Sequence, residues 1–158
     1  MSRITSMIFA IAFIASPVFA QSVEVTNQAL LEVVTVDENG EVKISYEEAE
    51  IVLPGSAILY RMEYTNVGDT PAEGVVLKSP ISPSLVYTEG SAESDGLRVQ
   101  YSIDSGVTFA NREDLVVTNP DGTLRPALAT DLTNIQWTVF GSLDLEASAT
   151  VSFRAIVK

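Results

Sequence analysis

The sequence predicts an all-β protein, a single immunoglobulin-like antiparallel β-sandwich of about seven to nine strands. Three observations support this fold class. Short β-branched and aromatic runs alternate between apolar and polar residues, and turn-forming residues separate these runs every 8 to 12 residues or so. The third is that the helix-like signal is confined to the acidic segment 47–50, which is too short to be a stable helix by itself.

A β-hairpin is the first predicted element. The apolar runs 33–36 and 42–44 flank the segment 37–41, which contains Asn39 and Gly40. Asn-Gly favours the tight turns of hairpins because both residues tolerate positive φ. We therefore place the tip of the hairpin at Asn39-Gly40.

The next strand is predicted over 58–65, after a turn at Pro54-Gly55. Alternate residues of this segment fall on two faces, as in a strand that is buried on one side. The face expected to be buried carries Ile58, Tyr60, Met62 and Tyr64. The strand ends at Asn66 and Gly68, whose permissive backbones are expected to form a tight turn.

Further strands are predicted over 74–78, 85–88, 97–103, 115–118, 134–140 and 147–157. The last of these alternates most regularly, which places on one face Val151, Phe153, Ala155 and Val157. Trp137 and the tyrosines are expected to fill the centre of the sandwich. Two long connections, 89–96 and 119–133, are where a binding surface is expected if the protein has one, although plain solvated loops are the simpler interpretation.

Residues 1–20 have the pattern of a secretory signal peptide. Arg3 precedes a short apolar run, and the segment ends in Val18-Phe19-Ala20. The apolar run is far shorter than the roughly 20 residues of a transmembrane helix. We therefore expect cleavage after Ala20, one domain over 21–158, a periplasmic or secreted location, and no membrane insertion once the signal is removed.

The segment 21–27 alternates between polar and apolar residues. We expect it to cover an edge of its own sheet, because an open strand edge favours aggregation. On this basis the protein is expected to be a monomer.

The composition excludes several kinds of chemistry. The chain has no Cys and no His, which removes disulfides, Ser-His-Asp and Cys-His catalysis, and metal sites ligated by these residues. A formal net charge of −12 argues against nucleic-acid and anionic-membrane binding. There is no Gly-rich nucleotide motif, and no pair of carboxylates stands out among 21 acidic residues, so a carboxylate hydrolase is only the third hypothesis. We expect no catalytic residues and no cofactor.

Several segments between about residues 48 and 158 resemble a bacterial family. They are 52–56, 58–65, 66–72, 75–77, and 84–87 with Gly90-Ser91. Together they are similar to the conserved-repeat domain of bacterial surface and secreted proteins, the domain of unknown function numbered eleven. The resemblance implies an immunoglobulin-like sandwich in an exported protein, and it says almost nothing about function. Unlike the family's common layout, we expect one copy here and no anchor after Lys158.

The segment 101–109 contains a motif with a candidate chemical role. The pattern consists of Ser102, Asp104, Gly106, Thr108 and Phe109. It resembles the Asp-box, a hairpin motif of sialidase-type propeller blades. In such a turn Asp104 accepts bonds from backbone amides and Gly106 takes a positive φ. We interpret the motif as a structural turn, because a single box without further blades does not make a sialidase.

Calcium binding is the alternative interpretation, because Ca²⁺ takes six to eight oxygen ligands and the chain is acidic. The weak candidates for calcium ligands are Asp104, Asp37 and Glu41, although 37–41 lacks the ligand spacing of a calcium loop. For function, the sequence favours an exported, non-enzymatic structural or interaction module of the bacterial cell envelope or exterior, with an unidentified protein or glycan partner. The alternative is a ligand-binding module for calcium or carbohydrate.

Overall fold

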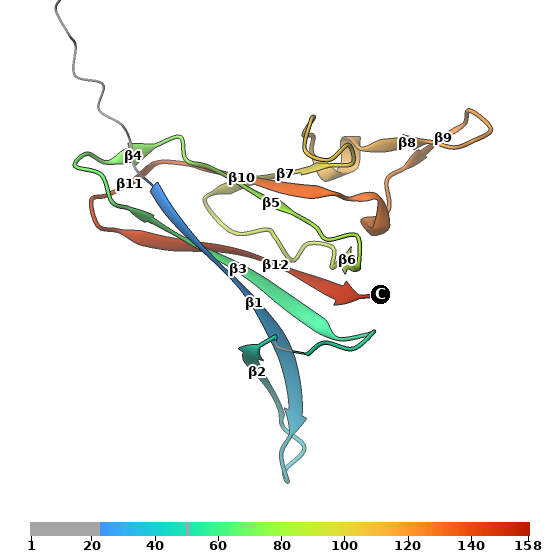
Figure 1. Ribbon diagram of the computed structural model, residues 1–158, viewed down its shortest axis with the longest axis horizontal. Helices are drawn as coiled ribbons and strands as arrows, with labels where there is room; N and C mark the ends of the chain where they lie inside the picture. Colours follow the sequence, from blue (N-terminus) through green and yellow to red (C-terminus); the bar gives the residue numbers. More distant parts are fainter. Residues whose placement is uncertain (1–22, 50) are drawn as a thin grey trace, which may run out of the picture.

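The computed structural model describes residues 23–49 and 51–158, and it confirms the all-β fold class. Two antiparallel sheets face each other with an apolar core between them, and a two-stranded hairpin extends away from both (Figure 1). The predicted signal peptide, 1–20, lies outside the described residues. Within the described part of the chain, no helix is long and apolar enough to cross a membrane.

The larger sheet has the strand order β2-β1-β3-β12-β6. Its members are β1 (Val23–Val36), β2 (Val42–Glu48), β3 (Ala57–Asn66), β6 (Leu85–Tyr87) and β12 (Ser148–Val157). Strand β1 is 14 residues long and pairs with two strands. Residues 23–31 pair with β3, and residues 30–36 pair with β2. Strand β2 is therefore an outer edge of this sheet.

The smaller sheet has the order β5-β10-β7. It consists of β5 (Val76–Pro80), β7 (Leu97–Ser102) and β10 (Asn134–Val139). Two short ladders join β4 (Ala72–Glu73) to β11 (Ser142–Leu143) and β8 (Val116–Thr118) to β9 (Leu124–Pro126). Two 3₁₀ turns, η1 (Arg112–Asp114) and η2 (Ala129–Asp131), lie in the connections around β8 and β9.

Aromatic side chains fill the core, as predicted. Trp137 and Phe153 are each 1% exposed. The Phe153 ring stacks on Tyr60, with 5.0 Å between centroids, and lies 6.3 Å from the Trp137 ring. Tyr87 and Tyr101 are also buried, and their hydroxyls form a hydrogen bond of 2.9 Å. The predicted inward faces of β3 and β12 are likewise confirmed.

Strand boundaries differ from the prediction in several places. The predicted strand 74–78 is interrupted because Gly74 has a φ of 62°, so β4 ends before it and β5 begins after it. The connection 119–133 contains β9, which pairs with β8. The helix-like acidic segment continues β2 as far as Glu48, because pairing with β1 outweighs a weak local preference. The described residues therefore form twelve strands, more than expected, and several are only two or three residues long.

Two predicted turns have different outcomes. Gly40 has a φ of 83° and its amide donates to the carbonyl of Asp37 at 3.0 Å, which confirms the hairpin tip. At 66–68 the prediction of a permissive backbone is wrong, since neither Asn66 nor Gly68 has a positive φ. The buried Asn66 side chain makes this turn instead: Oδ1 accepts from the Gly68 amide at 3.0 Å, and Nδ2 donates to the carbonyls of Thr70 and Leu143 at 2.8 and 2.9 Å.

The described part of the segment 21–27 belongs to β1 and covers its own sheet, as expected. Val23 lies opposite Asn66 of β3, and Asn27 lies opposite Met62.

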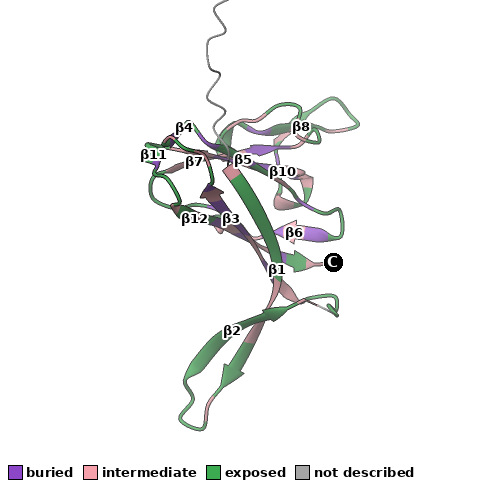
Figure 2. Ribbon diagram, turned by 60° about the vertical axis from the view of Figure 1, so that its left-hand side comes forward, coloured by how far each residue is buried: buried purple, intermediate pink, exposed green. Residues whose placement is uncertain are grey.

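The arm, which we define as residues 32–48, is the part of the β1–β2 hairpin that projects from the sandwich (Figure 2). An arginine of β12 holds its base. Arg154 Nε lies 3.0 Å from Glu32 Oε2, and Arg154 Nη2 donates to the Tyr46 hydroxyl at 2.8 Å. The base of the arm is thus attached to β12 of the larger sheet. Among residues 23–49 and 51–158, the outer half of the arm is paired only within the hairpin.

Candidate functional site

The segment 102–109 forms a compact turn after β7 and brings together the polar residues that the sequence singled out. Ser102 is fully buried. Its Oγ donates to Asp104 Oδ1 at 2.6 Å, and it accepts from the amides of Asp104 and Gly106 at 3.2 and 2.9 Å. One buried hydroxyl therefore organises the first half of the turn.

The Asp104 carboxylate organises the second half. Its Oδ1 accepts from the amides of Val107 and Thr108 at 3.1 and 2.9 Å, and its Oδ2 accepts from the Thr108 amide at 3.2 Å and hydroxyl at 2.6 Å. Hydrogen bonds from the side chains of Ser102 and Thr108, followed by those from the backbone, lower the pKa of Asp104 from 3.8 to about 2. Both carboxylate oxygens already have donors within the turn, which favours a structural role over cation binding.

The remaining motif residues also have structural contacts. Gly106 has a φ of 82°, and a Cβ at this position would lie 3.2 Å from Nδ2 of Asn134, so both conformation and space favour glycine. The ring of Phe109 is half-buried, and Lys78 Nζ lies 4.8 Å from its centroid in a cation–π contact.

Thr133 is a part of this turn that sequence reasoning missed. Its Oγ1 accepts from the Ser105 amide at 2.9 Å and donates to the Ser102 carbonyl at 3.1 Å. Thr133 is distant in the sequence and reaches the turn only because β10, which follows it, pairs with β7. No local pattern predicts such a contact.

The other two calcium candidates lie far from Asp104 in the fold, at the tip of the arm. Asp37 Oδ1 accepts from the amides of Asn39 and Glu41 at 2.9 and 3.0 Å, and these bonds lower the pKa of Asp37. Glu41 contributes its backbone to this turn. Across residues 23–49 and 51–158, no group of three or more His, Cys, Asp or Glu side chains is placed to hold a metal ion.

Residues of both long connections form ion pairs. Arg112 Nη2 lies 2.6 Å from Glu89 Oε1 and donates to the Ala127 carbonyl at 2.8 Å. In the second connection, Arg125 Nη1 lies 2.6 Å from Asp131 Oδ2, and this arginine is the main cause that lowers the pKa of Asp131 to about 2. The contacts of Arg112 join the two connections through η1, and the pair of Arg125 with Asp131 lies within the second connection.

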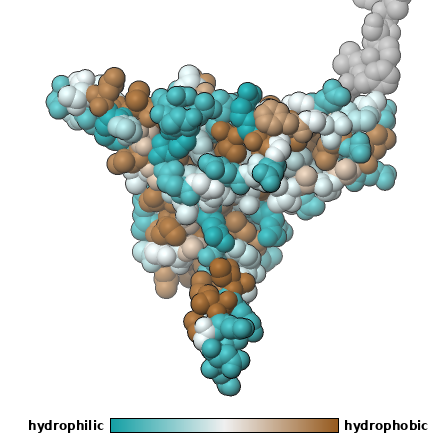
Figure 3. All heavy atoms as spheres, turned by 180° about the vertical axis from the view of Figure 1, so that it is seen from behind, coloured by the Kyte–Doolittle hydropathy of each residue, from teal (hydrophilic) through white to brown (hydrophobic). Residues whose placement is uncertain are grey.

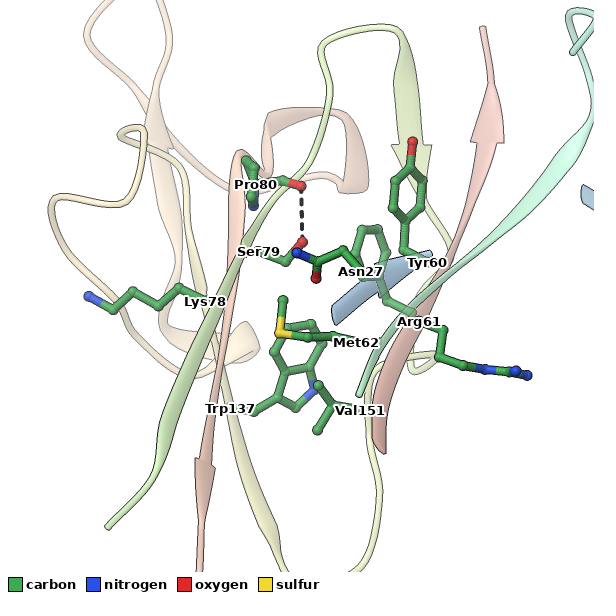
Figure 4. Close-up of a pocket in the computed structure, with 10 residues that line it drawn as sticks. Asn27, Tyr60, Arg61, Met62, Lys78, Ser79, Pro80, Trp137 and Val151 are labelled. Carbon is green, nitrogen blue, oxygen red and sulfur yellow. Dashed lines mark hydrogen bonds between the residues drawn. The ribbon is translucent and has the colours of Figure 1, made fainter. Parts of the chain in front are cut away.

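An apolar pocket of about 240 Å³ opens between β3, β12 and β5. Met62, Trp137 and Val151 lie toward its interior, whereas the long side chains of Arg61 and Lys78 extend away from it (Figure 4). Its volume is below the roughly 300 to 1,000 Å³ of typical small-molecule sites. We interpret the pocket as a gap at the open side of the sandwich.

The arm presents an uncovered apolar face. The register places Val34 opposite Ile44 and Val36 opposite Val42, so these side chains share one face with Tyr46. The five are between 37% and 65% exposed. Hydrophobic residues gather on the arm behind its hydrophilic tip (Figure 3). The sequence predicted the hairpin but not this exposed face, because alternation does not tell whether another layer covers the apolar side.

Comparison with known proteins gave no match, since no protein-family model, no curated protein and no solved structure matches the chain. The resemblance to the conserved-repeat domain therefore stays a prediction.

Proposed function

We propose that the protein is an exported, non-enzymatic structural or interaction module of the bacterial cell envelope or exterior, and that it binds its partner through the arm. The observation that carries this proposal is the apolar face of the arm. The inward-facing hydrophobic side chains of β3 and β12, such as Met62 and Phe153, pack in the core between the two sheets, whereas the apolar face of the arm is exposed to solvent.

The exposed face has a free-energy cost that a partner would remove. Val34, Val36, Val42 and Ile44 are each half exposed or more. Burying a Val or Ile side chain completely stabilises by about 1.5 to 3 kcal/mol, so covering these four would contribute about 4 kcal/mol before the entropic cost of association. Contiguous exposed apolar groups of this kind are typical of interaction sites.

The base of the arm also supports a binding role. A two-stranded ribbon by itself is only marginally stable in water. Here Arg154 contacts both strands of the ribbon, through Glu32 and Tyr46. The arm is therefore presented in a defined direction, which lowers the ordering cost of binding.

Site-specific photo-crosslinking in the exporting cell tests this proposal. A photoreactive residue at Ile44 is compared with one at Val116 on β8, because the two side chains are equally exposed, at 50% and 51%. We expect the chain in the periplasmic or secreted fraction and covalent products from position 44 only. Equal yields from both positions, or a chain retained in the cytoplasm, would contradict the proposal.

The same material distinguishes the alternative of a calcium- or carbohydrate-binding module. A melting temperature that rises with added calcium, or a signal on a glycan array that survives Ile44→Thr, would favour that alternative. We expect no stabilisation by calcium, because the donors within the turn occupy the Asp104 carboxylate. We expect no such glycan signal, because the arm is the proposed binding surface.

A further inference from the structure

We propose that the arm's partner is a second copy of this chain, joined edge to edge by antiparallel pairing of β2 with the β2 of the partner in a two-fold register centred on Ser45. This inference rests on the proposed function, because it uses the arm as the interaction surface.

The outer edge of β2 is available for pairing. All seven residues of Val42–Glu48 are exposed, and β2 is the outermost strand of its sheet. At the two ends of the hairpin ladder, the Asp37 amide donates to the Glu41 carbonyl and the Ala49 amide donates to the Ala29 carbonyl. Backbone directions alternate along a strand, so the odd-numbered residues face β1 and the even-numbered residues 42–48 direct their amides and carbonyls outward. Such a row of outward amides and carbonyls can form hydrogen bonds with the edge of another strand.

Three other edge strands, β5, β6 and β7, have features that oppose pairing. Strand β6 has only three residues, and β5 ends at Pro80, which has no amide hydrogen to donate. Strand β7 is partly covered by a bridge between Tyr101 and Ala110. Strand β2 is longer than β6 and contains no proline.

Symmetry restricts the register. A two-fold axis perpendicular to the sheet leaves each residue on its own face, so an even-numbered residue must lie opposite an even-numbered one. Centring the axis on Ser45 places Lys43 opposite the partner's Glu47 and Ile44 opposite the partner's Tyr46. Each pair occurs twice. Opposite charges and aromatic–β-branched pairs are the cross-strand combinations that stabilise a sheet.

The neighbouring registers lack this complementarity. An axis on Ile44 places Glu41 opposite the partner's Glu47, which sets like charges against each other. An axis on Tyr46 places Lys43 opposite the partner's Ala49 and Ile44 opposite the partner's Glu48, so both favourable pairs are lost. The register centred on Ser45 keeps both pairs and has one mismatch, Val42 opposite the partner's Glu48. The charge pattern of β2 therefore selects the register centred on Ser45.

Pairing in this register has a structural consequence. It brings the two apolar faces side by side on one surface of a continuous sheet and places each Tyr46 ring against an isoleucine. One short strand from each copy makes a small interface, so we expect a weak dimer whose population rises with concentration. We expected a monomer because the segment 21–27 covers an edge of its own sheet. Strand β2 is a separate edge, which that segment does not cover.

A cysteine scan tests the register directly, because the chain has no native Cys. At the axis of a non-hydrogen-bonded pair the two Cα atoms lie about 4.5 Å apart, within the range that a disulfide spans. We expect Ser45→Cys to form a disulfide-linked dimer under mild oxidation at least about tenfold faster than Ile44→Cys or Tyr46→Cys, whose symmetry mates would be roughly 8 Å apart. Faster linkage at position 44 or 46, or equal rates at all three, would overturn the register.

Charge reversal provides the second test, read by size-exclusion chromatography with light scattering over a range of concentrations. Lys43→Glu or Glu47→Lys alone should weaken dimerisation by on the order of tenfold, because each puts like charges opposite each other twice. The double variant restores opposite charges and should recover most of the wild-type affinity. Unchanged affinity in the single variants, or no recovery in the double variant, would contradict the pairing.

The two proposals fail in different ways. A chain that stays monomeric at high concentration but still crosslinks from position 44 to another envelope component overturns the dimer and leaves the proposed function in place. A monomer that gives no product from position 44 overturns both.

Discussion

Replacing Ser102 with alanine tests whether the turn at 102–109 is structural. The variant removes the buried Oγ that accepts from the amides of Asp104 and Gly106. The two amides then lose their acceptor, and the Asp104 carboxylate is held in place by its bonds to residues 107 and 108.

The expected loss follows from those two hydrogen bonds. Each is worth about 1 kcal/mol, so Ser102→Ala should lower the free energy of unfolding by about 2 kcal/mol. Loss of the bond between Ser102 and Asp104 should not lower the free energy of unfolding further, because the exposed carboxylate can bind water instead. For a chain of this size, the melting temperature should fall by roughly 4 to 8 °C.

Urea unfolding measures this loss through the fluorescence of Trp137, the single tryptophan of the chain and a buried core residue. Ser94→Ala, at an exposed position, is the matched control and should change stability by less than about 0.5 kcal/mol. If Ser102→Ala were as stable as this control, Ser102 would not organise the turn, and the structural interpretation of the motif would be wrong.

Three further predictions concern the Asn66 amide, the lowered pKa values of Asp104 and Asp131, and the signal peptide. Asn66→Ala removes three hydrogen bonds of a buried amide and should cost about 3 kcal/mol in urea unfolding. Asn119→Ala, at a half-buried position whose side chain makes a single hydrogen bond, should have a smaller effect. Acid should destabilise the protein, because the pKa values of Asp104 and Asp131 are lowered from 3.8 to about 2 in the folded state. The stabilisation from these two carboxylates is complete above pH 3.8 and is lost as the pH falls through about 2. Urea midpoints measured across that range should decline less steeply in the variant that combines Asp104→Asn and Asp131→Asn. Finally, intact-mass measurement of the exported protein should find residues 1–20 absent, and full-length chain in the membrane fraction would contradict the signal peptide.

The elements that local chemistry determines could be predicted from the sequence. Asn39-Gly40 marks a hairpin tip because Gly40 takes a positive φ that few other residues accept, and the regular alternation of β12 identifies its buried face. Elements that depend on distant partners could not be predicted. The short β9 exists because β8 lies beside it, and Thr133 enters the turn at 102–109 because β10 pairs with β7.

Asn66 shows a different limit of sequence reasoning. Its type is correct for a turn, and the turn is present, but the mechanism is a buried side-chain amide instead of a permissive backbone. The amide bonds to the carbonyl of Leu143, a residue of β11. A sequence pattern predicts which residue favours a turn. Whether the backbone or the side chain of that residue makes the hydrogen bonds depends on the fold.

The two candidate sites differ in how many of their polar and apolar groups have partners within the chain, and this difference is our reason for expecting a partner at the arm. In the turn at 102–109, the Ser102 hydroxyl and the Asp104 carboxylate both have partners within a few residues, so a ligand would have to displace existing hydrogen bonds. On the arm, the even-numbered residues of β2 direct unpaired backbone groups outward, and Val42 and Ile44 are exposed beside them. Folding alone gives no reason to leave both kinds of group uncovered, because polar tips or a second layer would be more stable. Exposed apolar side chains beside an unpaired strand edge, in a fold that otherwise buries and pairs such groups, are typical of functional surfaces. For this reason the apolar arm, which contains no predicted catalytic motif, is a stronger candidate for function than the turn with the more conspicuous sequence pattern.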